Sequence, residues 1–191
     1  MKQKVLLIDE NSSSSEILMI ALDDVGFEVV GRVSCNDDIM AGIRVCEPDV
    51  LVINMESPDV YIFNQLFEIN KTHPKPIVFF AEKGEEDVIN KAVKAGVSAF
   101  IVDGLTGRRL KPVIELAIAR FNEMQSLYKK LSASQVNLEE RKVIERAKGI
   151  LMSRKNVNED DAYNSLRTLA MSQNKKIFDI AKNVIEMSEL F

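Results

Sequence analysis

Residues that could carry out chemistry in the first half of this chain follow short apolar runs. Asp9 and Glu10 form an acidic pair after the first run, and the ends of later runs hold Asn54, Ala81 and Asp103. Two adjacent carboxylates can bind a divalent cation such as Mg²⁺, although a site of only two is weak. The chemistry open to these five residues depends on the elements that bring them together.

Five short apolar segments predict strands that are buried on both faces, because their apolar character is nearly continuous. Stretches with helical spacing separate them; one places Ile17 and Ile20 on its apolar face, and another does the same for Val93. This alternation predicts a doubly wound parallel α/β sheet of the (βα)5 type in residues 1–111, and such sheets bind ligands at the carboxyl ends of their strands. The predicted strands are residues 4–9, 28–33, 49–54, 76–81 and 99–103.

The first 111 residues resemble the receiver domain of bacterial response regulators. Working receivers carry an acidic pair after the first strand, an aspartate that accepts a phosphoryl group after the third, a hydroxyl side chain after the fourth and a lysine after the fifth. Here the acidic pair Asp9 and Glu10 is kept, but Asn54 takes the acceptor position, and a neutral amide cannot form an acyl phosphate. Ala81 has no hydroxyl and Asp103 reverses the charge of the lysine. The sequence therefore predicts a degenerate phosphoacceptor pocket.

Other kinds of active site find little support in the sequence. His73 is the only histidine, so no Ser/His/Asp or Cys/His set can be assembled credibly. Cys35 and Cys46 form no ligand cluster and are expected to be reduced thiols. The apolar runs are far shorter than the ~18 residues that a membrane span needs. We therefore expect a cytoplasmic protein that does not contact a membrane, is not an enzyme and has no cofactor beyond weak Mg²⁺ at Asp9 and Glu10.

Charge is distributed unevenly along the chain, whose formal net charge is −4. Residues 1–111 hold 12 basic and 18 acidic side chains, whereas residues 141–182 hold 10 basic and 5 acidic ones. An acidic first part and a locally basic second part indicate two different functions. The excess is weak evidence alone, since solvated helix faces often have the same composition.

A long helix is predicted after Pro112, because the next forty or so residues contain no proline and one glycine, Gly149. Its first part has heptad spacing, which is typical of a coiled-coil seam and favours a homodimer through a linker helix at residues 112–137. The alternative is that the segment from Ile114 to Phe121 packs on the sheet and the rest is a solvated connector. The predicted seam consists of Ile114, Ala117, Phe121, Met124, Tyr128, Leu131 and Leu138, with the polar Gln135 between the last two.

Residues 138–191 are predicted to form a small bundle of three helices. The segment 155–158 breaks the long helix, and Asn158 caps the next one, with Glu159 in its first turn. The segment 172–175 then separates this helix from the last one. A bundle this small is marginal by itself, and fusion to a dimerising helix would help to stabilise it.

This C-terminal part resembles the ANTAR domain, an RNA-binding antiterminator module. The whole chain, including residues 54–58 and 96–102, is similar to the NasT-like family of nitrate-responsive transcription antiterminators. Receiver-like domains of that family often lack the full phosphorylation set, which fits the departures at Asn54, Ala81 and Asp103. The ANTAR resemblance rests on residues 141–152 (RKVIERAKGILM) and on 160–163, 166–167 and 170–171.

Within this module, the helix stripe that carries Arg141 and Lys148 is predicted to face outward beside an apolar stripe. Gly149 in mid-helix costs about 1 kcal/mol relative to alanine, which indicates close approach by another backbone or by RNA. Tyr163 can stack on an unpaired base or lie half-buried in the core, and each cation can contact phosphate or remain solvated. The predicted RNA-binding residues are Arg141, Lys142, Arg146, Lys148, Gly149, Met152, Arg154, Tyr163, Arg167, Lys175 and Lys176.

The resemblance also implies a function for the whole chain. It implies binding to two adjacent hairpins in the leader RNA of nitrate/nitrite assimilation operons, which prevents the terminator from forming. It further implies a nitrate-binding sensor protein (NasS-like) that sequesters the chain through the receiver-like domain, in place of control by phosphorylation. Two alternatives stay open: a phosphorylation-dependent two-component response regulator, and a protein-binding adaptor without RNA binding.

Overall fold

The computed structural model describes residues 2–10, 12–102 and 107–189. Asp103, the last residue of the predicted phosphoacceptor pocket, lies outside the described residues. Two compact units succeed one another along the chain, Met1–Gln125 and Ser126–Phe191. The domain limits predicted at 111/112 and 137/138 remain predictions. None of the described helices is both long and apolar enough to cross a bilayer.

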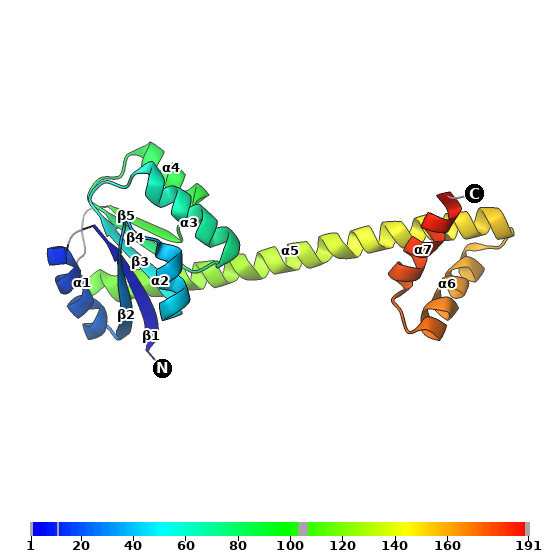
Figure 1. The fold of residues 1–191 in the computed structure, drawn as a ribbon, viewed down its shortest axis with the longest axis horizontal. Helices are drawn as coiled ribbons and strands as arrows, with labels where there is room; N and C mark the ends of the chain where they lie inside the picture. The colour runs from blue at the N-terminus through cyan, green and yellow to red at the C-terminus, as the bar shows by residue number, and fades with distance from the viewer. Residues whose placement is uncertain (1, 11, 103–106, 190–191) are drawn as a thin grey trace. The chain divides into compact units, whose positions relative to one another are not determined.

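The first unit is built on a five-stranded sheet in which all neighbouring strands are parallel (Figure 1). The predicted α/β class and all five predicted strands are confirmed. In the strand order β2-β1-β3-β4-β5, the chain adds β2 on one side of β1 and the later strands on the other side. This change of side between β1 and β3 defines a doubly wound sheet. The strands are β1 (Gln3–Asp9), β2 (Phe27–Ser34), β3 (Val50–Met55), β4 (Ile77–Ala81) and β5 (Ala99–Val102).

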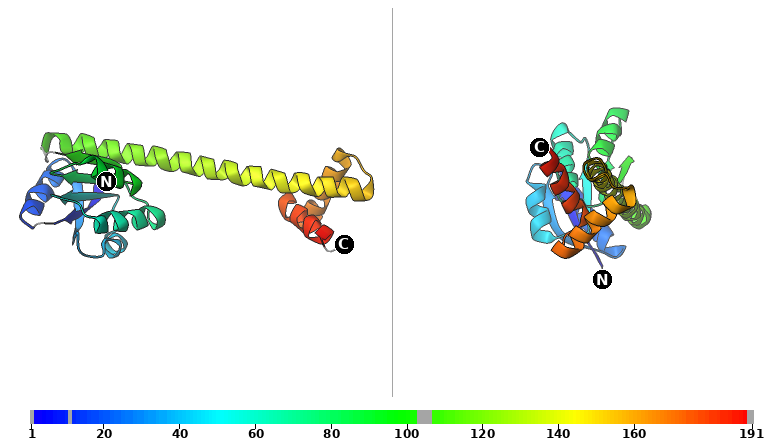
Figure 2. Two further views of the ribbon diagram at one scale, coloured as in Figure 1. Left: turned by 90° about the horizontal axis from the view of Figure 1, so that it is seen from above. Right: turned by 90° about the vertical axis from the view of Figure 1, so that its right-hand side faces the viewer.

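Helices cover both faces of this sheet (Figures 1 and 2). Leu6 and Ile8 point to one face, where they share a core with α2, α3 and α4, while Val5 and Leu7 share the other core with α1 and the start of α5. Because both faces are covered, the strands are apolar along nearly their whole length. The helices are α1 (Ser12–Asp24), α2 (Ile39–Cys46), α3 (Val60–Thr72), α4 (Glu86–Lys94) and α5 (Gly107–Lys155).

Two of these helices begin at aspartates that cap them. The Asp38 carboxylate accepts a hydrogen bond from the Ala41 N–H at 3.2 Å, and the Asp59 carboxylate accepts one from the Ile62 N–H at 3.0 Å. Such caps satisfy backbone donors that have no partner in the first turn of a helix. They fix the start of α2 and α3 and therefore the loops at the strand ends before them.

The expected orientation of two helices is wrong in part. Ile17 and Ile20 of α1 are 73% and 64% exposed, and Val93 of α4 is 67% exposed. Leu18 and Leu22 instead form the buried face of α1. Because α1 is apolar on more than one side, spacing alone did not determine which apolar residues face the sheet.

The long helix α5 begins at Gly107, so Pro112 lies inside it near its start. Ile114 and Ala117 are fully buried in the core of the first unit, which corrects the predicted seam. These two residues pack on the sheet, as the alternative interpretation had it, and Phe121 is only half-buried. The remaining apolar seam residues are 53% to 61% exposed: Met124, Tyr128, Leu131 and Leu138.

The second unit combines the last part of α5 with α6 (Glu159–Gln173) and α7 (Ile177–Glu189), as Figure 2 shows. The predicted helix break is confirmed: Asn156 is left-handed (φ 52°), and the Asn158 side chain accepts from the Asp161 N–H at 2.8 Å. Asn174, also left-handed, ends α6. The core is formed by Ala147, Leu166, Ala170, Ile180 and Ala181.

Candidate functional site

The sheet brings the predicted pocket residues of the first unit together at the carboxyl ends of its strands. Asp9 of β1 is opposite Asn54 of β3, and Met55, the next residue of β3, is opposite Ala81 of β4. Glu10 is exposed, and its Oε2 accepts from the Glu56 N–H at 3.4 Å. The register therefore brings these residues of three adjacent strands to one edge of the sheet, and we call this group the strand-end pocket after the predicted phosphoacceptor pocket.

Asp9 has a partner that sequence reasoning missed. The Ser15 hydroxyl donates a hydrogen bond of 2.6 Å to Asp9 Oδ2, and both residues are buried. Ser15 is the last of four consecutive serines, and no motif distinguishes it from its neighbours. The pair ties the end of β1 to α1.

The strand-end pocket does not fit phosphoryl transfer. Asn54 offers a neutral amide in place of a nucleophile, and Ala81 offers a methyl group in place of a hydroxyl. The described residues contain no group of three or more His, Cys, Asp or Glu side chains arranged to hold a metal ion. Asp9 and Glu10 are two carboxylates at this edge of the sheet, and no reaction step follows from them.

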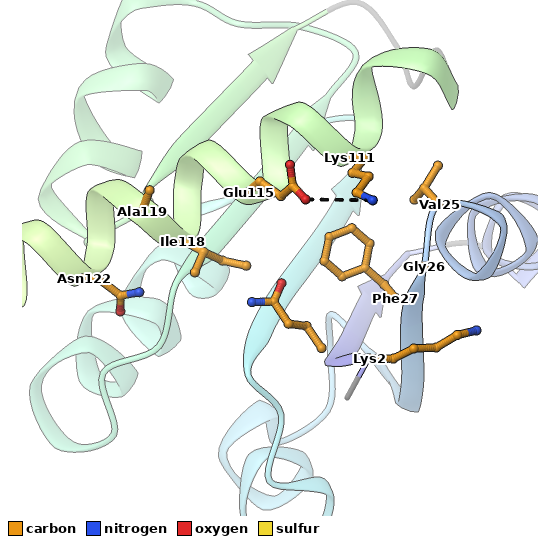
Figure 3. A pocket seen from close by; sticks show the side chains of 10 residues that line it. Lys2, Val25, Gly26, Phe27, Lys111, Glu115, Ile118, Ala119 and Asn122 are labelled. Carbon is orange, nitrogen blue, oxygen red and sulfur yellow. Dashed lines mark ion pairs between the residues drawn. The ribbon is translucent and has the colours of Figure 1, made fainter.

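A different hollow lies at the opposite, N-terminal ends of β1 and β2, between them and α5 (Figure 3). It has a volume of about 490 Å³, and Phe27 and Ile118 line it. Its two lysines both have carboxylate partners: Lys2 Nζ is 2.7 Å from Asp23, and Lys111 Nζ is 4.0 Å from Glu115. Because these charges are balanced, the hollow favours neither an anion nor a cation.

In the second unit, most of the predicted cations are exposed. Arg141, Lys142 and Arg146 lie on the outer side of α5, away from the buried Ala147. Arg154 is exposed as well, but its Nη2 donates to the Ser188 carbonyl at 2.9 Å, so it also joins α5 to α7.

Lys148 is the exception, and the outward orientation predicted for it is wrong. Its side chain is 9% exposed, and Nζ lies 2.7 Å from Glu145 and 2.6 Å from Glu159. The hydrogen bonds that Lys148 donates to these carboxylates, Glu145 first, raise the pKa of Lys148, and Lys148 lowers the pKa of Glu159. Lys148 therefore joins α5 to the first turn of α6 and is not available to phosphate.

The signal for this ion network was present in the sequence. Glu145 precedes Lys148 by three residues, which places both on one side of a helix. The next helix opens with three acidic residues after a short turn, so its first turn had to return close to the end of α5. Considered by residue type alone, these acids are explained by the helix dipole, which favours negative charge at the start of a helix.

Gly149 faces open space. A Cβ atom added there would meet no atom within 4 Å, and Met152, one turn further, is 36% exposed. Close approach by another backbone, one of the two explanations predicted for this glycine, does not occur within the described part of the chain. The cost of Gly149 to the helix is thus not offset by packing inside the unit.

The turn between α6 and α7 forms a hollow with the neighbouring side of α5, which we call the basic pocket. It has a volume of about 630 Å³ and is lined by Ile144 of α5, Arg167 and Met171 of α6, Phe178 of α7 and residues of the turn. Lys175 and Lys176 belong to that turn. The pocket brings together Arg167, Lys175 and Lys176, three of the predicted cations.

Tyr163 and Met171 extend the surface around this pocket. Tyr163, Arg167 and Met171 follow one another at intervals of four residues and therefore share one side of α6. Tyr163 is 40% exposed and Met171 is 73% exposed. The sequence analysis named Tyr163 and Arg167 as RNA-binding residues but missed Met171 and Phe178. The spacing of these two apolar residues does not distinguish them from core residues.

Comparison with known proteins identifies this part of the chain. Residues 133–185 match the model of the ANTAR domain family. The second unit carries an ANTAR domain. The chain is 27% identical over 184 residues to the transcriptional regulatory protein PdtaR of Mycobacterium tuberculosis. The aligned residues cover 96% of this chain and 90% of that protein. It is 33% identical over 89 residues to the nitrate regulatory protein of Klebsiella oxytoca, covering 47% of this chain and 22% of that protein.

Solved structures show the fold of the part that precedes the ANTAR domain. The signal receiver domain of a modulated diguanylate cyclase from Desulfovibrio desulfuricans has a TM-score of 0.56 at 16% identity, covering 65% of this chain and 99% of that one. A CheY-like receiver from Methanospirillum hungatei gives the same score, identity and coverage. The chain therefore combines a receiver-like fold with an ANTAR domain.

Proposed function

We propose that this protein is an RNA-binding transcription antiterminator that acts in the cytoplasm on paired hairpins in leader RNA. The observation that carries the proposal is the set of exposed cations within the ANTAR domain, on the outer side of α5 and around the basic pocket. Contacts to phosphate supply most of the affinity of proteins for nucleic acid, and single-stranded loops are the usual targets of specific RNA recognition.

We assign the RNA to nitrate and nitrite assimilation operons. The resemblance of the whole chain to NasT-like antiterminators supports this assignment, as does the 33% identity to a nitrate regulatory protein over 89 residues. Stabilising two hairpins in the leader would compete with formation of the terminator, and polymerase would read through.

The protein acts as a homodimer in this proposal. Met124, Tyr128, Leu131 and Leu138 are exposed at heptad spacing on α5, and a second copy of the helix would cover them. A dimer offers one ANTAR domain to each hairpin, and binding of the second hairpin then becomes intramolecular.

Control by a partner, a nitrate-binding sensor protein, replaces control by phosphorylation. The neutral Asn54 at the acceptor position supports this, since the strand-end pocket lacks a phosphoryl acceptor. The receiver-like fold then serves as a surface for that partner.

Binding to a transcribed two-hairpin leader of a nitrate operon, with the same sequence as DNA for comparison, tests the RNA proposal. We expect Lys175→Ala combined with Lys176→Ala to weaken RNA binding and to reduce the salt dependence of log Kd by about 1 to 2. Lys83→Ala with Lys94→Ala, which removes two exposed charges from the first unit, is the matched control and should change neither.

Equal affinity for RNA and DNA, or equal effects of the two double variants, would contradict the proposal. Single-round transcription through the same leader provides the functional readout. The wild-type protein should increase readthrough, and the Lys175/Lys176 variant should lose that increase in proportion to its lost affinity.

A further inference from the structure

We propose that the basic pocket holds a single unpaired base of the hairpin loop, while the phosphates beside that base contact the cations at its rim. This inference rests on the proposed RNA binding and adds the part of the RNA that the ANTAR domain reads. It concerns residues of α5, α6, α7 and the turn between the last two, all within one compact unit.

The pocket has room for a base, and its walls suit one. Its volume of about 630 Å³ falls within the range of small-molecule sites, about 300–1,000 Å³. Ile144, Met171, Ile177 and Phe178 supply apolar surface, and Met171 is 73% exposed. Bases that leave the stack of a loop are bound by aromatic and apolar side chains that cover their faces.

The charge around the pocket suits the backbone that carries the base. Arg167, Lys175 and Lys176 line it and are exposed, so they can reach the phosphates on either side of an inserted nucleotide. Lys182 adds a further cation, with Nζ 4.7 Å from the centre of the Phe178 ring. The first turn of α7 begins at Ile177 in the pocket wall. The positive end of the α7 dipole therefore adds to the positive charge of these cations.

Glu140 makes the pocket selective. It lines an otherwise basic hollow and is half-buried on α5. An ionised carboxylate only accepts hydrogen bonds, so it pairs with the amino group of adenine, guanine or cytosine. Uracil has no amino group, and its single N3–H lies between two carbonyl oxygens that repel a carboxylate, so uracil is the base that Glu140 disfavours.

A double-mutant cycle between protein and RNA tests the pocket directly. In the leader RNA of the previous section, each unpaired loop base of one hairpin is replaced in turn by an abasic site. One position should weaken binding to the wild-type protein by about 5- to 100-fold, the usual effect of removing one stacked base. Met171→Ala should weaken binding to intact RNA, and the penalty of that abasic site should shrink or vanish in this variant.

Met187→Ala is the matched control, because Met187 of α7 is 67% exposed and does not line the pocket. In this variant every abasic penalty should equal that of the wild-type protein. Additive effects of Met171→Ala and all abasic sites would overturn the pocket while leaving RNA binding intact. A wild-type protein that does not prefer the leader RNA to DNA would instead overturn the proposed function itself.

The role of Glu140 has its own test. Replacing the base at the sensitive position by uracil should weaken binding to the wild-type protein, and Glu140→Gln should reduce that penalty because its amide can also donate. An unchanged uracil penalty in Glu140→Gln would overturn the selectivity assigned to Glu140.

Discussion

The strand-end pocket of the receiver-like fold and the basic pocket of the ANTAR domain are assembled in opposite ways. In the first, the parallel register brings Asp9, Asn54 and Ala81 to one edge of the sheet, but a nucleophile and a hydroxyl are missing. In the second, Arg167 and the cations of the α6–α7 turn come from segments that no register aligns, yet the charges are present and exposed. A retained framework therefore does not imply retained chemistry, and function has to be argued from each site.

The same contrast holds within the ANTAR domain between two lysines of α5. Lys148 lies between two carboxylates with a side chain 9% exposed, whereas Lys142 is exposed on the outer side of the helix. Both residues are lysines of the same helix, so their surroundings alone make one a structural charge and leave the other available to a partner.

The largest effect should come from the exposed seam of α5. Leu131 is 56% exposed, so Leu131→Asp removes little packing within the chain but places a charge in the proposed dimer interface. The solution mass should fall from twice to once the chain mass of 21.5 kDa, and affinity for the two-hairpin leader should drop by about 100-fold or more through lost avidity. Light scattering and RNA titration measure both, with Ala133→Asp, outside the seam, as the control.

Gly149→Ala should separate folding from binding. Because the added Cβ meets no atom within 4 Å, we expect the variant to raise the free energy of unfolding by up to about 1 kcal/mol. If RNA approaches the helix at this position, the same methyl group should weaken RNA binding. Thermal unfolding and RNA titration on one sample test the two effects. Unchanged RNA affinity would show that RNA does not approach the helix at Gly149. Ser153→Ala, one turn further, should leave RNA affinity unchanged.

The two lysines of α5 should respond in opposite ways. Lys148→Met removes the ion network, so it should lower the thermal midpoint of the ANTAR domain by a few degrees while leaving the salt dependence of RNA binding unchanged. Lys142→Met should leave the midpoint unchanged and weaken RNA binding. The reverse pattern would indicate that Lys148 contacts RNA.

The pH dependence of this network has a defined sign. The pKa of Glu159 is lowered, so its stabilisation is present above its unfolded pKa and is lost as the pH falls through the lower folded value. The pKa of Lys148 is raised, so its stabilisation is lost only as the pH rises through that raised value. Thermal midpoints measured down an acid series should therefore fall less steeply for Glu159→Gln than for the wild-type protein.

The smallest effect is expected in the strand-end pocket. Asn54→Ala should change RNA affinity by less than about 2-fold, and incubation with acetyl phosphate should neither label the protein nor strengthen RNA binding, because the acceptor position is neutral. Labelling accompanied by tighter RNA binding would favour the phosphorylation-dependent regulator.

Much of the fold could be predicted because its signals are local. Continuous apolar runs marked the five strands, and Asn158 marked the start of α6 by its capping chemistry. Contacts between distant segments were not predictable in this way: Ile17 and Leu18 are adjacent and both apolar, yet only Leu18 meets the sheet.

The same distinction, between local signals and contacts of distant segments, applies to the candidate functional site. The missing acceptor at Asn54 and the exposed cations could be named from residue types, whereas the burial of Lys148 depends on how α6 returns along α5. The hydroxyl of Ser15 on Asp9 and the apolar wall of the basic pocket likewise depend on packing between elements.

The buried position of Ile114 and Ala117 also sets the order of events during synthesis. β1 pairs with β3 only after β3 has been made, and the sheet face that α1 packs on stays incompletely covered until the first turns of α5 have been made. The receiver-like core can thus close only after about residue 117 has left the ribosome. The ANTAR domain, whose core comes from consecutive helices, can then fold quickly on local contacts. A chain shortened to residue 111 would lack Ile114 and Ala117, so part of the apolar core that they complete would be open to water and prone to aggregation.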